Sequence, residues 1–123
     1  GCRGLVGPYA GQDCIAPVTV NTDRNDYSFT SDYWALAHFS KFIQLGAKRI
    51  DATTPSACTT TPVSGWRCGL EGVAFDNPDG SRVLVATAND GVDHTFTLSD
   101  NGRKTTYTLP AGATATFVWK PVA

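Results

Sequence analysis

The sequence predicts a mainly β fold, an antiparallel β-sandwich with one amphipathic helix near the N-terminus. Thr, Val and Ile together account for 29 of the 123 residues, and β-branched side chains favour strands over helices. From Leu70 onward, apolar stretches recur at intervals of roughly eight to twelve residues with turn signals between them, which is typical of a sandwich. Only the segment that begins at Ser31 carries a helical pattern.

The N-terminal part is predicted to contain a loop, a hairpin and the helix, in that order. Residues 1–15 are rich in Gly and Pro, which indicates a loop. Residues 16–20 and 27–30 flank the polar turn 21–26 and therefore predict a small hairpin.

The helix is predicted over residues 31–45. Ser31 is a suitable N-cap, Asp32 complements the helix dipole in the first turn, and Gly46 is suited to the position just after the last turn. An apolar stripe with spacings of three and four residues contains Ala35, Leu36, Phe39, Phe42 and Ile43. The next stretch, 53–69, is rich in turn-forming residues.

The C-terminal part is predicted to be β throughout. Asp79-Gly80 and Asn101-Gly102 are strong hairpin signals. Residues 82–89 are apolar on both faces, as in a central buried strand. Alternation on the later strands predicts inward-facing side chains at Phe96, Leu98, Tyr107, Leu109, Ala115, Phe117 and Trp119.

Composition limits the classes of partner. The net charge is −1 and charged residues make up 17% of the chain, so we expect neither a nucleic-acid partner nor an anionic membrane surface. No apolar run approaches the roughly 20 residues that a membrane-spanning helix needs, so no membrane span is expected.

Four cysteines fall into two local pairs, Cys2 with Cys14 and Cys58 with Cys68. Neither pair has the spacing of a metal site, so we expect no metal and no cofactor. Each pair would close a short loop, which favours disulfides Cys2–Cys14 and Cys58–Cys68 among the three possible pairings. The alternative is four free thiols in a cytosolic protein. Disulfides would place the chain in an oxidising, extracellular compartment.

Few side chains are candidates for catalysis. Glu71 is the only glutamate, so any mechanism that needs two glutamates is excluded for this chain alone. The acids Asp76, Asp79, Asp90 and Asp93 could form a calcium site or an acid pair, but Asp79 and Asp90 belong to turn motifs, which favours local backbone hydrogen bonds. His38 lacks an accompanying nucleophile motif and is expected to pack or to make a structural hydrogen bond.

Glycan contact is a second possibility. Thr95, Thr97, Thr106, Thr108 and Thr116 are predicted to point outward on a flat polar face, which could bind a glycan or be simply solvated. Among the tryptophans, Trp34 and Trp119 are predicted to pack. Trp66 lies in the loop closed by the second cysteine pair and is the best candidate for an exposed sugar platform, although it could also fill the loop.

Three stretches resemble the C-terminal region of glycoside hydrolase family 30: 32–50, which includes Tyr33-Trp-Ala-Leu-Ala-His-Phe-Ser-Lys-Phe-Ile43, then 73–89 and 109–119. The opening residues 1–6 also resemble the loop after the last barrel strand in secreted members. The family usually has Pro where this chain has Leu45 and Ser where it has Ala113, and the 53–69 stretch matches nothing in it.

The resemblance implies a division into two parts: 1–46, with the last barrel loop and helix, and 47–123, the side β-sandwich. The partner would be a catalytic (β/α)8 barrel, and the parent chemistry retaining hydrolysis of β-linked glycans. Both family glutamates precede this segment, so the chain would be the non-catalytic part of a secreted enzyme. Arg3, Tyr9 and Asp13 would line the rim of the substrate cleft. The alternative is a free-standing carbohydrate-binding module.

Overall fold

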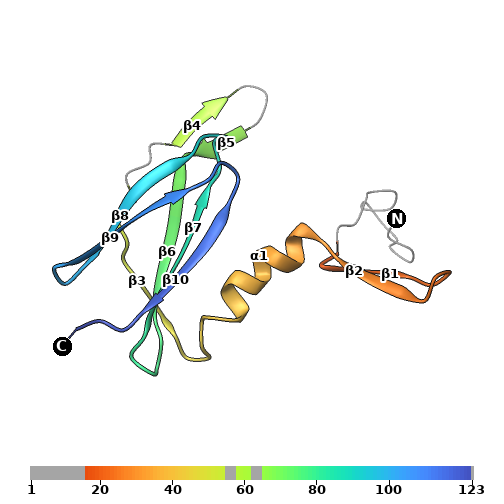
Figure 1. The fold of residues 1–123 in the computed structure, drawn as a ribbon, viewed down its shortest axis with the longest axis horizontal. Coiled ribbons are helices and arrows are strands. Elements are labelled where there is room, and N and C mark those ends of the chain that lie inside the picture. Colours follow the sequence, from red (N-terminus) through yellow and green to blue (C-terminus); the bar gives the residue numbers. More distant parts are fainter. Residues whose placement is uncertain (1–15, 55–57, 62–64, 123) are drawn as a thin grey trace. The chain divides into compact units, whose positions relative to one another are not determined.

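The computed structural model describes residues 16–54, 58–61 and 65–122. Contacts divide the chain into two compact units, Gly1–Ala37 and His38–Ala123. The second unit contains most of the strands (Figure 1).

In the first unit, strands β1 (Val18–Asn21) and β2 (Asp26–Phe29) form the predicted antiparallel hairpin. The Asn21 side-chain oxygen accepts hydrogen bonds from the backbone N–H groups of Asp23 and Arg24, at 3.0 and 3.1 Å. Asn25 takes a positive φ of 52°, which Asn tolerates better than most residues. The turn is therefore fixed by its own asparagines.

Helix α1 (Ser31–Ser40) begins at Ser31 itself, so its cap is Thr30, one residue before the predicted cap, and the helix ends five residues before the predicted end. The carbonyl of Thr30, rather than that of Ser31, accepts the first helical bond, from the Trp34 N–H at 3.4 Å. At the other end, the Asn77 side chain accepts the Gln44 N–H and donates to the Phe42 carbonyl, both at 3.0 Å. These hydrogen bonds occupy the backbone N–H and C=O groups that a longer helix would use for its own bonds.

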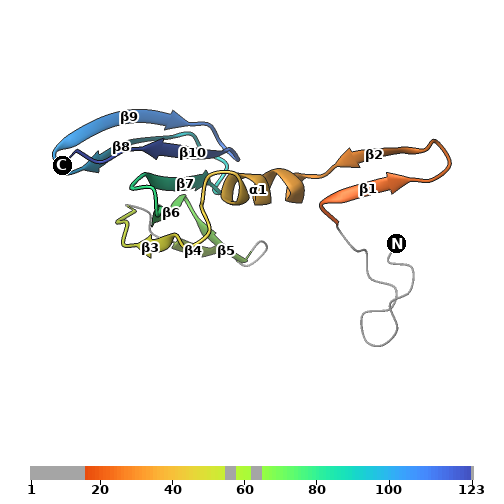
Figure 2. The ribbon, with the colours of Figure 1, turned by 90° about the horizontal axis from the view of Figure 1, so that it is seen from below.

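The second unit contains a four-stranded antiparallel sheet in the order β10-β7-β6-β3. Its strands are β3 (Lys48–Ile50), β6 (Leu70–Asp76), β7 (Arg82–Ala88) and β10 (Thr114–Trp119). The hairpin of β8 (His94–Asp100) and β9 (Arg103–Leu109) forms a second sheet. A third pair, β4 (Cys58–Thr61) and β5 (Gly65–Cys68), lies where only turns were predicted. Figure 2 shows the β8–β9 hairpin on one side of β6 and β7, so the predicted antiparallel sandwich is confirmed.

The core lies between the two main sheets. Its buried residues are Leu70, Ala74, Leu84, Ala86, Ala88 and Leu109, and Phe96, Leu98, Ala115, Phe117 and Trp119 pack against them. Val83 and Val85, on the other face of β7, are also buried, which confirms the prediction of a central strand apolar on both faces. Tyr107 contacts Phe117 at 5.1 Å between ring centroids but stays 43% exposed, so it faces the core only in part.

Candidate functional site: a cavity between the sheets

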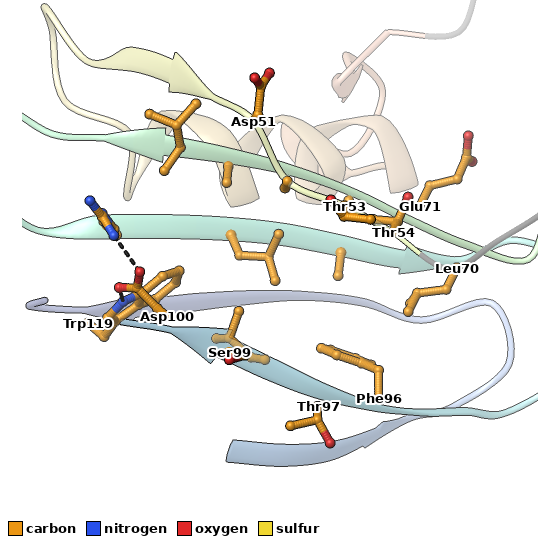
Figure 3. A pocket seen from close by; sticks show the side chains of 18 of the residues that line it. Asp51, Thr53, Thr54, Leu70, Glu71, Phe96, Thr97, Ser99, Asp100 and Trp119 are labelled. Carbon is orange, nitrogen blue, oxygen red and sulfur yellow. Dashed lines mark hydrogen bonds and ion pairs between the residues drawn. The ribbon is translucent and has the colours of Figure 1, made fainter. Parts of the chain in front are cut away.

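A cavity of about 860 Å³ lies between the four-stranded sheet and strand β8. Its apolar wall includes Ile50, Leu70, Ala74, Leu84, Phe96 and Leu98, and Figure 3 shows their strands on either side of it. The segment 51–54 forms a further wall. Gly72 lets that segment approach β6, because a Cβ there would lie only 3.3 Å from the Thr54 methyl and 3.2 Å from a Leu84 methyl. A space of this volume is in the range of ligand pockets.

A charged network lies at one end of the cavity. Arg82 donates through Nε to Asp76 at 2.8 Å and through Nη1 to Asp100. Trp119 donates its indole N–H to the second Asp100 oxygen at 2.7 Å (Figure 3). The hydrogen bond to Asp76, together with the charges of both acids, raises the Arg82 pKa. Both oxygens of Asp100 are engaged, so this network suits structural support more than proton transfer.

Glu71 lies at the other end of the cavity from Asp100 and Trp119 (Figure 3), and its side chain is exposed. Retaining hydrolysis needs two carboxyl groups roughly 5–5.5 Å apart on either side of one bond. Carboxyl groups at opposite ends of a cavity do not make that arrangement. Glu71 and Asp100 therefore do not form such a pair.

The turn acids act as hydrogen-bond acceptors, as predicted. Asp79 accepts from the Ser81 hydroxyl and N–H at 2.6 and 2.9 Å and from Gln44 Nε2 at 2.8 Å. These bonds, with that of the Ser81 hydroxyl the largest effect, lower the Asp79 pKa to about 2. A general acid needs a raised pKa instead.

A second acid, Asp90, pairs with His94 Nε2 at 2.8 Å, and this hydrogen bond lowers the Asp90 pKa. Asp93 accepts the Ala111 N–H at 2.8 Å. Over the ranges that the structure describes, no group of three His, Cys, Asp or Glu side chains could hold a metal ion.

His38 makes the structural hydrogen bond that the sequence predicted, with its Nδ1 2.8 Å from the Thr116 hydroxyl. Thr116 points away from the inter-sheet core, as predicted, but this contact leaves it partly buried and outside any flat exposed polar face. The other four threonines are exposed, as expected. They pair across the hairpin, Thr95 with Thr108 at 2.8 Å and Thr97 with Thr106 at 3.1 Å.

The remaining predicted site residues divide into those outside the described part of the chain and those on the β4–β5 pair. Arg3, Tyr9, Asp13, Cys2 and Cys14 lie outside the described residues. The backbone of Trp66 lies on β5 opposite Thr60, and Cys58 lies directly opposite Cys68.

Sequence reasoning missed the roles of Arg82 and Asp100. Their only signal is a position at the end of a strand next to a turn, which many solvated residues share.

Comparisons with known proteins identify the sandwich. The sequence profile described as the glycosyl hydrolase family 30 beta sandwich domain matches residues 46–117. Endo-1,6-beta-D-glucanase BGN16.3 of Trichoderma harzianum is 33% identical over 106 residues, which are 85% of this chain and 20% of the relative. Lysosomal acid glucosylceramidase of Mus musculus is 30% identical over 106 residues, 85% of this chain and 19% of the relative.

Solved structures agree on the fold. The endo-beta1,6-glucanase BT3312 has a TM-score of 0.68 and 28% identity, over 89% of this chain and 22% of that one. SrfJ from Salmonella typhimurium has a TM-score of 0.70 at 23% identity with the same coverage, a likeness of fold alone. This chain thus spans about a fifth of the length of the proteins that it matches. In the described part of the chain, no helix is long and apolar enough to cross a membrane.

Proposed function

The chain belongs to glycosyl hydrolase family 30 through its β-sandwich domain, and we propose that it is the non-catalytic C-terminal part of a larger retaining glycosidase. In this proposal the sandwich supports a catalytic (β/α)8 barrel that acts on β-linked glycans. The similar endo-1,6-beta-D-glucanases make a β-1,6-glucan the first substrate to test.

The placement of the acids carries this proposal. Glu71 is the only glutamate in the chain, and it lies exposed at the far end of the cavity from Asp100 (Figure 3). Asp100 itself is held by Arg82 and Trp119. Double-displacement chemistry with two glutamates therefore requires a part of the enzyme that this chain does not contain.

Assays with the purified 123-residue chain and its Glu71→Gln variant test the proposal. We expect no hydrolysis of β-1,6-glucan or of an aryl β-glucoside by either protein, at enzyme concentrations far above those used for complete glucanases. Turnover by the wild type that Glu71→Gln abolishes would show that the chain is itself catalytic and would refute the proposal.

A free-standing carbohydrate-binding module is the second candidate, and the cavity of about 860 Å³ favours it. Calorimetric titration with β-1,6-glucan oligosaccharides separates the two candidates. Saturable binding that Trp119→Ala removes while the fold persists would favour the module. A supporting domain gives no such signal.

Three finer points are part of the proposal. We place the protein outside the cell, with disulfides Cys2–Cys14 and Cys58–Cys68. The opposed positions of Cys58 and Cys68 support the second bridge. We divide the chain into 1–46 and 47–123, a division that the sandwich match over 46–117 supports. Arg3, Tyr9, Asp13 and Trp66 are the residues that we expect near bound glycan.

A further inference from the structure

The turn between β8 and β9 leaves a reactive pair of groups open to solvent. Asn101 and Gly102 form its loop, between the paired residues Asp100 and Arg103. Both loop residues are exposed and have positive φ, 48° and 83°, and a Cβ added to Gly102 would meet nothing within 4 Å. Among the described residues, neither the Asn101 side chain nor the Gly102 N–H has a hydrogen-bond partner. The side-chain amide carbon and the backbone nitrogen that follows it are therefore both unprotected.

We propose that Asn101 is a site of spontaneous deamidation, with water as the co-reactant. As the exposed turn fluctuates, the Gly102 backbone nitrogen gives its proton to solvent base and attacks the Asn101 side-chain amide carbon. A five-membered cyclic imide forms, and ammonia leaves. Water then opens the ring: attack at the side-chain carbonyl gives aspartate, and attack at the main-chain carbonyl gives isoaspartate, in which the chain runs through Cγ. Asparagine is among the thermolabile residues of proteins for this kind of reason.

The comparable pair Asp79 and Gly80, in the turn between β6 and β7, keeps the corresponding groups engaged. Gly80 also has a positive φ, of 80°. The Asp79 carboxylate accepts hydrogen bonds from Ser81 and Gln44, and the Gly80 N–H donates to the Asn77 carbonyl at 3.0 Å. Both the attacking nitrogen and the carbon that it would attack are held in place. The fold therefore protects this turn and leaves the β8–β9 turn open.

The other four asparagines are protected by their contacts or by the residue that follows them. Asn77 is buried and precedes a proline, which has no N–H to lose. Asn21 and Asn89 precede residues whose side chains hinder the attack. Asn25 is the best match to Asn101, because it is exposed and has a φ of 52°, but the next residue is an aspartate held in β2. We therefore expect Asn101 to react first.

The products would alter the end of the hairpin that carries the charged network. Aspartate at position 101 adds a negative charge beside Asp100, which already accepts hydrogen bonds from Arg82 and Trp119. Isoaspartate adds a carbon atom to the main chain of the short loop. The register that pairs Asp100 with Arg103 depends on the length of that loop. Deamidation through isoaspartate therefore loosens the hairpin where it contacts Trp119.

Incubation of the full chain at mildly alkaline pH, followed by peptide mapping with mass spectrometry, tests the inference. We expect Asn101 to exchange its amide for an acid at least tenfold faster than Asn25, with aspartate and isoaspartate products separated by chromatography. The rate should rise with pH, because the attacking nitrogen must lose its proton. Asn101→Gln should remove the fast exchange, since glutamine would need a six-membered ring. An Asn101 that stays intact, or that reacts no faster than Asn25, would overturn the inference.

Two further measurements separate the fold from the dipeptide. Urea removes the hydrogen bonds that hold Asp79 and Gly80, so we expect it to accelerate isoaspartate formation at Asp79 more than deamidation at Asn101. Equal acceleration would show that those hydrogen bonds give no protection. The isolated isoaspartate form should have a lower Tm than both the unmodified chain and Asn101→Asp, which carries the charge on a main chain of normal length. Equal Tm values for the three would overturn the loosening of the hairpin.

Discussion

At the scale of single residues, the turn between β6 and β7 does more than reverse the chain. Asn77 is 6% exposed, and its side chain bonds to Phe42, Gln44 and Ser81. Gly46, with a φ of +89°, lets the chain turn directly over Pro78, which a Cβ there would meet at 3.4 Å. The turn therefore fixes the point at which α1 ends and the sandwich begins.

The acid in this turn makes folding stability depend on pH. The Asp79 pKa is about 2 in the folded protein, against an ordinary value of 3.8. The folded state thus prefers the charged carboxylate, and its stabilising contribution is complete above the ordinary value and is lost as the pH falls toward 2. We expect Asp79→Asn to flatten the fall in urea midpoint between about pH 5 and pH 2. Asp51→Asn, at another exposed acid, serves as the control, and an unchanged slope in Asp79→Asn would contradict this assignment.

At the scale of elements, the sequence predicted helices and strands best where the residue pattern was local. Alternation and the Asn101-Gly102 turn predicted the β8–β9 hairpin, because side-chain pattern and turn chemistry act within a few residues. The predicted end of α1 was wrong because the Asn77 side chain, distant in sequence, makes the hydrogen bonds that end the helix. The β4–β5 pair was missed because its Gly, Pro and Cys neighbours resemble turn residues, despite three consecutive threonines. The cavity depends on the spacing of two sheets, which no local pattern encodes.

The β4–β5 pair leads to a prediction about its cysteines. Cys58 and Cys68 are opposed in the register, so we expect a disulfide between them in protein produced under oxidising conditions. Closing a loop of about a dozen residues is worth roughly 3 kcal/mol in the chain-entropy estimate. Non-reducing peptide mapping should yield a linked 58–68 fragment, and the double variant C58S/C68S should lower Tm. A peptide that links Cys14 to Cys58 would contradict the pairing.

At the scale of the whole molecule, the packing of the two sheets depends on few buried side chains of strand β9. Leu109 is 1% exposed, whereas the other residues of β9 are all exposed. The cavity leaves part of the inter-sheet space unfilled. Leu109 is therefore the main attachment of β9 to the core.

Truncating that side chain tests the attachment. We expect Leu109→Ala to lower the free energy of unfolding by about 2–5 kcal/mol, the range for buried leucines. Leu45→Ala is the matched control, because Leu45 is fully exposed and should change stability by less than about 0.5 kcal/mol. Both values come from urea denaturation followed by circular dichroism. A similar loss for the two variants would show that β9 is not anchored by Leu109.

The short strand β3 has a consequence for protein that is produced at high concentration. It lies at one edge of the four-stranded sheet, is three residues long, and carries Lys48 and Arg49, both exposed. Open sheet edges are where one molecule can add its strand to another and start a fibril, and short, positively charged edges discourage this. At this edge, a second copy meets three residues of backbone and two like charges. The brevity of β3 thus protects this side of the sheet against ordered aggregation.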